Sequence, residues 1–156
     1  MQYLMKKKLF DLESEFKIKC DGISKYNTKL VSSNGQKELH ISNIHFEEII
    51  KIVASELEKA KEFKICLYGR MILKVNMKDY VNKQILFRSM YGDEYDVIEH
   101  KGNLEHNNYI IRKNGLRIAK SFRKPLAQID EYAIDILEVE NQALILAIAI
   151  VVDECV

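Results

Sequence analysis

The sequence predicts a mostly β protein with a single domain over residues 1–156, in which antiparallel strands close into a barrel around a hydrophobic C-terminal helix. Two observations favour this fold: a run of ten apolar residues near the C-terminus and a β-hairpin pattern that occurs three times. With 156 residues, 47% of them hydrophobic, the chain is long enough to bury one substantial core.

The apolar run covers residues 143–152, "ALILAIAIVV". As a helix it would span about 15 Å, whereas a bilayer crossing needs roughly 20 residues. Asn141 is a suitable N-cap, Glu138 and Glu140 stand near the positive end of the helix dipole, and the alanines are weak strand formers. A helix that is apolar on all sides must be buried on all sides, so we expect strands to surround it.

Three segments share one hairpin pattern: "FKIKCDGISKYN", "FKICLYGRMILK" and "YIIRKNGLRIAK". Each has an aromatic residue, an isoleucine two residues later and a glycine six residues later. The aromatic residue and the isoleucine share a strand face by alternation, and the glycine suits a turn that needs a positive φ. We therefore expect a β-hairpin in each segment, with its turn at Gly22, Gly69 or Gly115.

Further short strands are predicted at residues 84–91, 94–100 and 131–139, separated by polar breaks. A repeat period near 46 residues also occurs in β-propellers, but three copies are too few for a propeller, and a propeller has no place for an apolar helix. A closed barrel removes edge strands and gives the helix an apolar interior.

Residues 44–61, "IHFEEIIKIVASELEKAK", are expected to form an amphipathic helix on the barrel surface. Phe46, Ile49 or Ile50, Val53, Leu57 and Ala60 recur at helical spacing, acids come early and lysines late. This helix is expected to pack one stripe on the barrel wall or to close one end of the barrel. The alternative is a helix that binds a membrane surface or a partner, and the mixture of glutamates and lysines on its polar face argues against a lipid-seeking role.

The segments "YDVIEHKGN", "NNYIIRKNGLRIAKSFRK" and "EYAIDILEVENQALILAIAIVVDE" resemble the LURP-one-related family of the tubby C-terminal-like superfamily. The resemblance is specific over residues 63–156, above all in "GLRIAK" and in the apolar run. It implies a barrel of about twelve antiparallel strands around a hydrophobic C-terminal helix, with strands in the region where the periodicity predicts the helix 44–61. The superfamily includes phosphoinositide-binding proteins and relatives of phospholipid scramblases.

No motif of a hydrolase, a nucleotide-binding enzyme or a calcium-binding loop is present, and the four histidines lack the spacing of metal ligands. We expect no catalytic residue, metal or cofactor. Cys20, Cys66 and Cys155 form no CxxC motif, which favours free thiols in a reducing compartment. The N-terminus lacks the features of a secretory signal. We expect a cytoplasmic protein without a transmembrane segment.

Charge is unevenly distributed, although the formal net charge is only +1 and gives no general case for nucleic acid. Residues 130–156 hold seven acids and no base, whereas residues 106–129 hold no acid and six bases: Arg112, Lys113, Arg117, Lys120, Arg123 and Lys124. One interpretation is that the two segments neutralise each other across neighbouring strands. The other is that Arg117 and Arg123, on a shared outward face, join Lys113 to bind an anion.

Two functions therefore remain open. The chain is expected to be a non-enzymatic binding module that recognises anionic phospholipid or phosphorylated ligands through this basic hairpin at the membrane periphery. The alternative is a protein-interaction or regulatory scaffold without a small-molecule ligand, whose partner is another protein.

Overall fold

The computed structural model describes residues 1–12, 14–33, 35–57, 60–76, 80–81, 84–100, 108–123 and 130–155. Within these residues the elements are β1 (Gln2–Lys6), η1 (Leu9–Asp11), β2 (Phe16–Cys20), β3 (Ile23–Ser33), β4 (Gln36–Asn43), β5 (Glu48–Leu57), β6 (Ala60–Leu67), β7 (Arg70–Asn76), β8 (Tyr80–Val81), β9 (Gln84–Ser89), β10 (Tyr95–Glu99), β11 (Tyr109–Lys113), β12 (Leu116–Phe122), β13 (Glu131–Ile136) and α1 (Gln142–Cys155).

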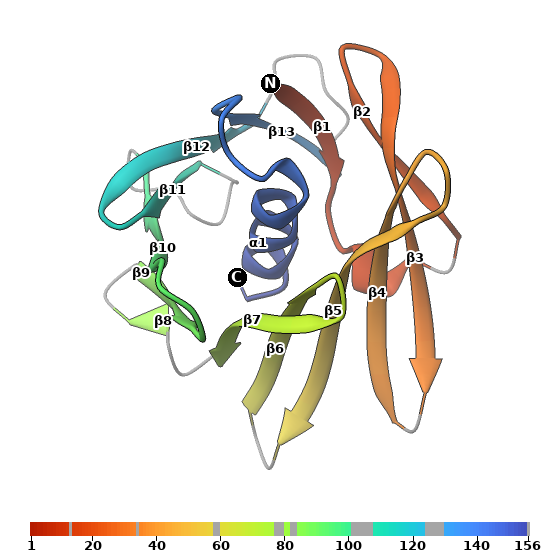
Figure 1. Cartoon of the computed structure of the whole chain (residues 1–156), viewed down its shortest axis with the longest axis horizontal. Helices are drawn as coiled ribbons and strands as arrows, with labels where there is room; N and C mark the ends of the chain where they lie inside the picture. Colours follow the sequence, from red (N-terminus) through yellow and green to blue (C-terminus); the bar gives the residue numbers. More distant parts are fainter. Residues whose placement is uncertain are drawn as a thin grey trace.

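The strands form a closed antiparallel barrel around α1 (Figure 1). Neighbours follow the order β10-β11-β12-β13-β1-β2-β3-β4-β5-β6-β7-β9, and pairing of β9 with β10 closes the ring of twelve. The short β8 pairs with β9. The predicted barrel class is confirmed. Closure leaves no open edge among these twelve strands.

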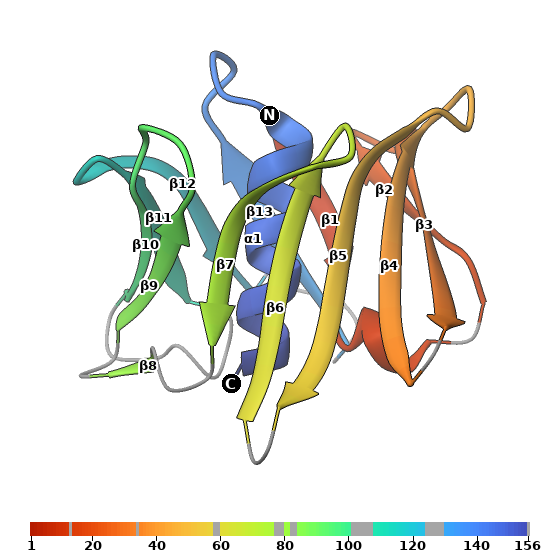
Figure 2. The ribbon, with the colours of Figure 1, turned by 60° about the horizontal axis from the view of Figure 1, so that its bottom comes forward.

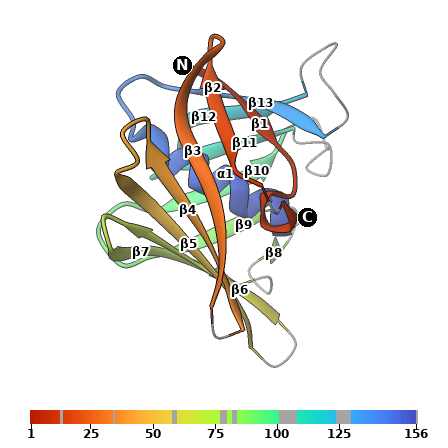
Figure 3. The same cartoon turned by 90° about the vertical axis from the view of Figure 1, so that its right-hand side faces the viewer.

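Helix α1 lies inside the ring, as the views from the side show (Figures 2 and 3). Every residue from Ala143 to Asp153 is buried. The side-chain Oδ1 of Asn141 accepts a hydrogen bond from the Leu144 amide at 3.2 Å, so the predicted N-cap is confirmed. Within the described residues, no helix is both long enough and apolar enough to cross a membrane.

The three predicted hairpins are confirmed as β2–β3, β6–β7 and β11–β12. At each turn the glycine and the residue before it have positive φ, as a type I′ turn requires. Each hairpin also has a register irregularity at the same place, directly after the shared isoleucine: Ile18, Ile65 and Ile111. The ring thus divides into three runs of four strands, each beginning with one of these hairpins: β11-β12-β13-β1, β2-β3-β4-β5 and β6-β7-β9-β10.

The helix expected at residues 44–61 was wrong. Its described part is a turn followed by β5 and the start of β6. Ile50 and Ile52 alternate onto the buried inner face, and β5 pairs with β4 on one side and β6 on the other. The β-branched sequence "EIIKIV" suits a strand with two partners, so this pairing outweighs the helical spacing. Residues 58–59 lie outside the described residues.

All connections between an ascending strand and the next descending element lie at one end of the barrel, because neighbouring strands alternate in direction (Figure 2). We call this end the upper rim. It consists of six segments: 21–22, 44–47, 68–69, 90–94, 114–115 and 137–141. The C-terminal end of α1 lies at the opposite end, where the Lys8 amide donates to Asp153 Oδ2 at 2.6 Å.

Candidate functional site

The basic hairpin β11–β12 does not present its predicted cations as one group. Arg112 is held by Asp96 of β10: its Nε donates to Asp96 Oδ1 at 2.9 Å, and its Nη2 pairs with Asp96 Oδ2. Hydrogen bonding to Asp96 raises the pKa of the Arg112 guanidinium. A bidentate pair of this kind uses two of the five guanidinium donors, and the carboxylate offsets the positive charge that would attract an anionic ligand.

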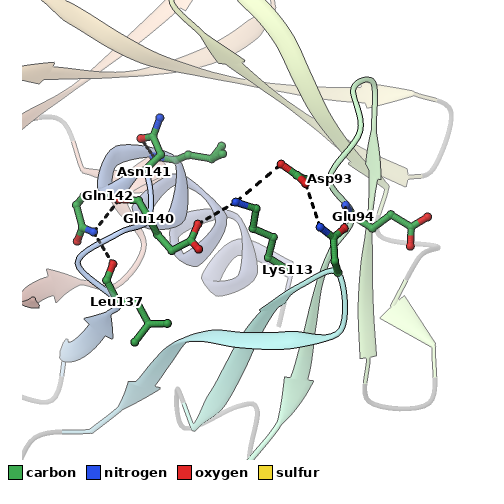
Figure 4. Close-up of polar contacts among 9 residues, drawn as sticks. Asp93, Glu94, Lys113, Leu137, Glu140, Asn141 and Gln142 are labelled. Carbon is green, nitrogen blue, oxygen red and sulfur yellow. Dashed lines mark hydrogen bonds and ion pairs between the residues drawn. The ribbon is translucent and has the colours of Figure 1, made fainter.

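Lys113 is also engaged with acids, as Figure 4 shows. Its Nζ lies 3.2 Å from Glu140 Oε2 and 3.8 Å from Asp93 Oδ2. The hydrogen bond that Lys113 donates to Glu140 raises the pKa of the Lys113 ammonium. Lys113 therefore fixes the segment before α1 against the β9–β10 turn.

Three of the predicted cations lie farther along the hairpin. Arg117 and Arg123 are exposed and Lys120 is half-buried. Within the described residues these three side chains form no hydrogen bond or ion pair. Lys124 lies outside the described residues.

The bulge in β11–β12 changes which of these cations share a face. Ile118 and Ala119 are both buried in succession. The two successive buried residues interrupt the alternation that would place Arg117 and Arg123 on one face of the strand. After the bulge, Lys120 is the next residue that shares the outward face with Arg117.

The acidic segment does neighbour the basic hairpin. Strand β13 pairs with β12, and Lys120 lies opposite Asp135. A shallow pocket of about 340 Å³ lies here, and its lining includes Arg117, Lys120 and Asp135. The carboxylate of Asp135 reduces the positive charge that this pocket offers to an anion.

The upper rim is ordered by side-chain hydrogen bonds between its segments (Figure 4). Asn114 Nδ2 donates to Asp93 Oδ1 at 3.0 Å, and Asn114 Oδ1 accepts from the Glu94 amide at 2.8 Å. Gln142 Nε2 donates to the carbonyl oxygens of Leu137 and Glu140, each at 2.9 Å. The Asn114 bonds join the segments 90–94 and 114–115. The Gln142 bonds hold the segment 137–141 against the start of α1, and Lys113 joins that segment to the other two.

Exposed hydrophobic side chains gather at the upper rim. Of the eleven large hydrophobic side chains that are exposed in the described part of the chain, only Leu86 lies elsewhere, on the wall in β9. The other ten belong to the rim segments or to the strand ends beside them: Met1, Ile23, Ile44, Phe46, Tyr68, Met90, Tyr91, Leu116, Leu137 and Val139. A concentration of this kind at one end of a molecule is typical of an interaction surface.

Two of these residues, Phe46 and Tyr68, combine exposure with an unfavourable backbone conformation. Phe46 is 78% exposed at φ 61°, and Tyr68 is 74% exposed at φ 48°. Large side chains rarely adopt this left-handed region, which costs about 1–2 kcal/mol. At the position of Tyr68, the other two hairpins have Asp21 and Asn114, which tolerate it better.

The sequence pattern reveals neither aromatic residue as a surface feature: the helical spacing predicts Phe46 in the packed stripe of a helix, and no motif marks Tyr68. The alignment of the three hairpins could have revealed Tyr68, because an aromatic residue there replaces the usual turn residue. Exposed and strained side chains without an intramolecular benefit are found at functional sites.

A second pocket, of about 470 Å³, lies at the opposite end of the barrel. Phe10 and Phe63 line it together with Lys37, Lys61 and Glu154. Burial raises the pKa of the Glu154 carboxyl. Because acids and bases are mixed here, the pocket has no clear preference for ligands of one charge.

The described residues hold no group of three or more His, Cys, Asp or Glu side chains suited to a metal ion. The three cysteines are free thiols, and burial raises the pKa of the Cys66 thiol. A raised pKa reduces the thiolate fraction on which nucleophilic chemistry depends.

Comparison of the chain with protein-family models, with curated proteins and with solved structures gave no match.

Proposed function

We propose that this chain is a non-enzymatic protein-binding module that binds its partner through the upper rim, on a scaffold of the LURP-one-related type. The gathering at the rim of ten of the eleven large hydrophobic side chains that are exposed among the described residues carries this proposal. Aromatic and aliphatic side chains at the centre of an interface contribute much of its binding energy. The barrel with its central helix supports the proposed family, because that fold is what the resemblance implies.

Anionic-ligand binding is the second candidate. It is favoured by Arg117 and Arg123, which are exposed and form no ion pair within the described residues. It is weakened by Arg112 and Lys113, whose charges are already paired with Asp96 and Glu140. Exposed single cations attract anions weakly at physiological salt, so we rank this function below protein binding.

Site-specific photo-crosslinking tests the proposed function. Benzoylphenylalanine is placed at Phe46, at Tyr68 or at Leu86 in cells that produce the protein naturally. Leu86 is the matched control, because it is an exposed hydrophobic residue on the wall. We expect positions 46 and 68 to yield the same protein adduct on irradiation and position 86 to yield none. Equal adducts at all three positions, or none at 46 and 68, would refute protein binding at the rim.

A further inference from the structure

The segments of the upper rim are strongly acidic. They hold six acidic residues and no lysine or arginine; the acids are Asp21, Glu47, Asp93, Glu94, Glu138 and Glu140. Asp93 and Glu140 are paired with Lys113. The other four form no ion pair within the described part of the chain, and all four are exposed. The rim therefore retains negative charge around its apolar side chains.

The border of the rim carries two arginines, which are fewer than the four acids without an ion pair in the described residues. The guanidinium of Arg70 lies over the ring of Tyr91, 3.8 Å from the ring centroid. Arg117 stands on β12 near the turn 114–115. The Arg70–Tyr91 contact also indicates how an aromatic ring of this surface receives a cation.

Phe46 and Tyr68 offer the same chemistry to a partner. Both rings are mostly exposed. A lysine or arginine side chain of a partner can stack on such a ring while its charge approaches a nearby carboxylate. Glu47 directly follows Phe46 in the same turn. An apolar ring beside an acid thus favours a partner that carries apolar side chains and positive charges next to each other.

The same charge disfavours two other occupants. An anionic membrane would repel the acids that surround the hydrophobic side chains. A second copy of this chain, docked rim to rim, would bring the four unpaired acids of each copy together, and such like-charge contacts oppose association.

We infer that the partner of the upper rim is a protein segment in which lysine or arginine residues stand beside apolar residues. This inference rests on the proposed protein-binding function and specifies the chemistry of the partner. The acids attract and orient the segment, and the hydrophobic side chains around them provide the apolar contact area.

Fluorescence anisotropy with short labelled peptides tests this inference on the full chain. The probe alternates lysine with leucine. Matched peptides replace every lysine by glutamate, every lysine by serine, or every leucine by serine. We expect the lysine–leucine peptide to bind measurably and each of the three matched peptides to bind at least about tenfold more weakly. The affinity of the lysine–leucine peptide should fall markedly as added salt screens the charges.

Matched variants locate the binding. Glu47→Gln with Glu94→Gln removes two rim charges, and Asp11→Asn with Glu15→Gln removes two exposed acids at the opposite end. All four are exposed, so folding should be little affected. We expect the rim pair to weaken binding about tenfold and the control pair to leave it unchanged. Phe46→Ser with Tyr68→Ser should also weaken it, whereas Leu86→Ser should not.

Several outcomes would overturn the inference. Equally tight binding of the glutamate–leucine peptide would exclude a role for charge. Failure of every peptide, while crosslinking at the rim succeeds, would reject the basic partner but leave protein binding intact. If the protein sediments with phosphatidylcholine or phosphatidylserine vesicles, and the Phe46→Ser, Tyr68→Ser variant does not, the rim binds a membrane instead of a protein. If no peptide binds, and vesicle sedimentation is lost in the Arg117→Glu, Arg123→Glu variant but not in the Phe46→Ser, Tyr68→Ser variant, the function belongs to the basic hairpin.

Discussion

Phe46 and Tyr68 show at the scale of single residues how stability and binding compete on this surface. Each side chain is exposed and each backbone is left-handed, so no burial of the side chain offsets the free-energy cost of the backbone conformation. In the hairpins equivalent to that of Tyr68, the position is held by Asp21 and Asn114, which favour such turns.

Replacing Tyr68 by asparagine should stabilise the fold. Asn-Gly is the preferred pair in a type I′ turn, so we expect the free energy of unfolding to rise by about 1 kcal/mol. Tyr91→Asn is the control, because Tyr91 is not at a positive φ and its loss removes the stacking of Arg70. Urea unfolding measures both. A destabilised Tyr68→Asn variant would mean that the tyrosine supports the fold, contrary to the strain argument.

The glycines were predictable from sequence alone because a short pattern determines their conformation. Gly22, Gly69 and Gly115 follow the aromatic residue of each hairpin at a constant spacing, and each has the positive φ that was expected. The partners of the basic residues were not predictable in this way. Arg112 pairs with Asp96, sixteen residues earlier in the chain, and only strand register brings the two together.

At the scale of secondary-structure elements, α1 and β5 show when a local pattern suffices. The run of apolar residues in α1 allows no exposed face, so its burial follows from composition. The segment of β5 satisfies both a helical and a strand pattern. Its state is decided by hydrogen bonding to β4 and β6, which are partners that local periodicity cannot reveal.

A charge inside the barrel should prevent folding. Ile148 in α1 is fully buried. Ile148→Asp would place a carboxylate in an apolar interior, and we expect it to lower the free energy of unfolding by at least about 4 kcal/mol. Val139→Asp is the matched control, because Val139 is 89% exposed and its change should stay within about 0.5 kcal/mol. Thermal unfolding followed by circular dichroism separates the two. A normally folded Ile148→Asp variant would place α1 outside the core.

At the scale of the whole molecule, barrel closure creates the candidate binding surface. The six rim segments are spread from residue 21 to residue 141 and lie at one end of the barrel only because alternating strands return to that end (Figure 2). The sequence indicated a barrel and a charge asymmetry, and it directed attention to the basic hairpin. It could not show that exposed hydrophobic residues from distant segments share one end, since that depends on the order and direction of all the strands.

Amide chemical-shift mapping by NMR tests most directly whether the upper rim is the binding surface. Isotope-labelled protein is titrated with the lysine–leucine peptide, and the shift of each assigned amide is followed. We expect the largest changes in segments 44–47, 68–69 and 90–94, with little change along β3 and β4 below the rim. Changes centred on Lys120 and Arg123, or on the pocket beside Lys37 and Lys61, would contradict the assignment of binding to the upper rim.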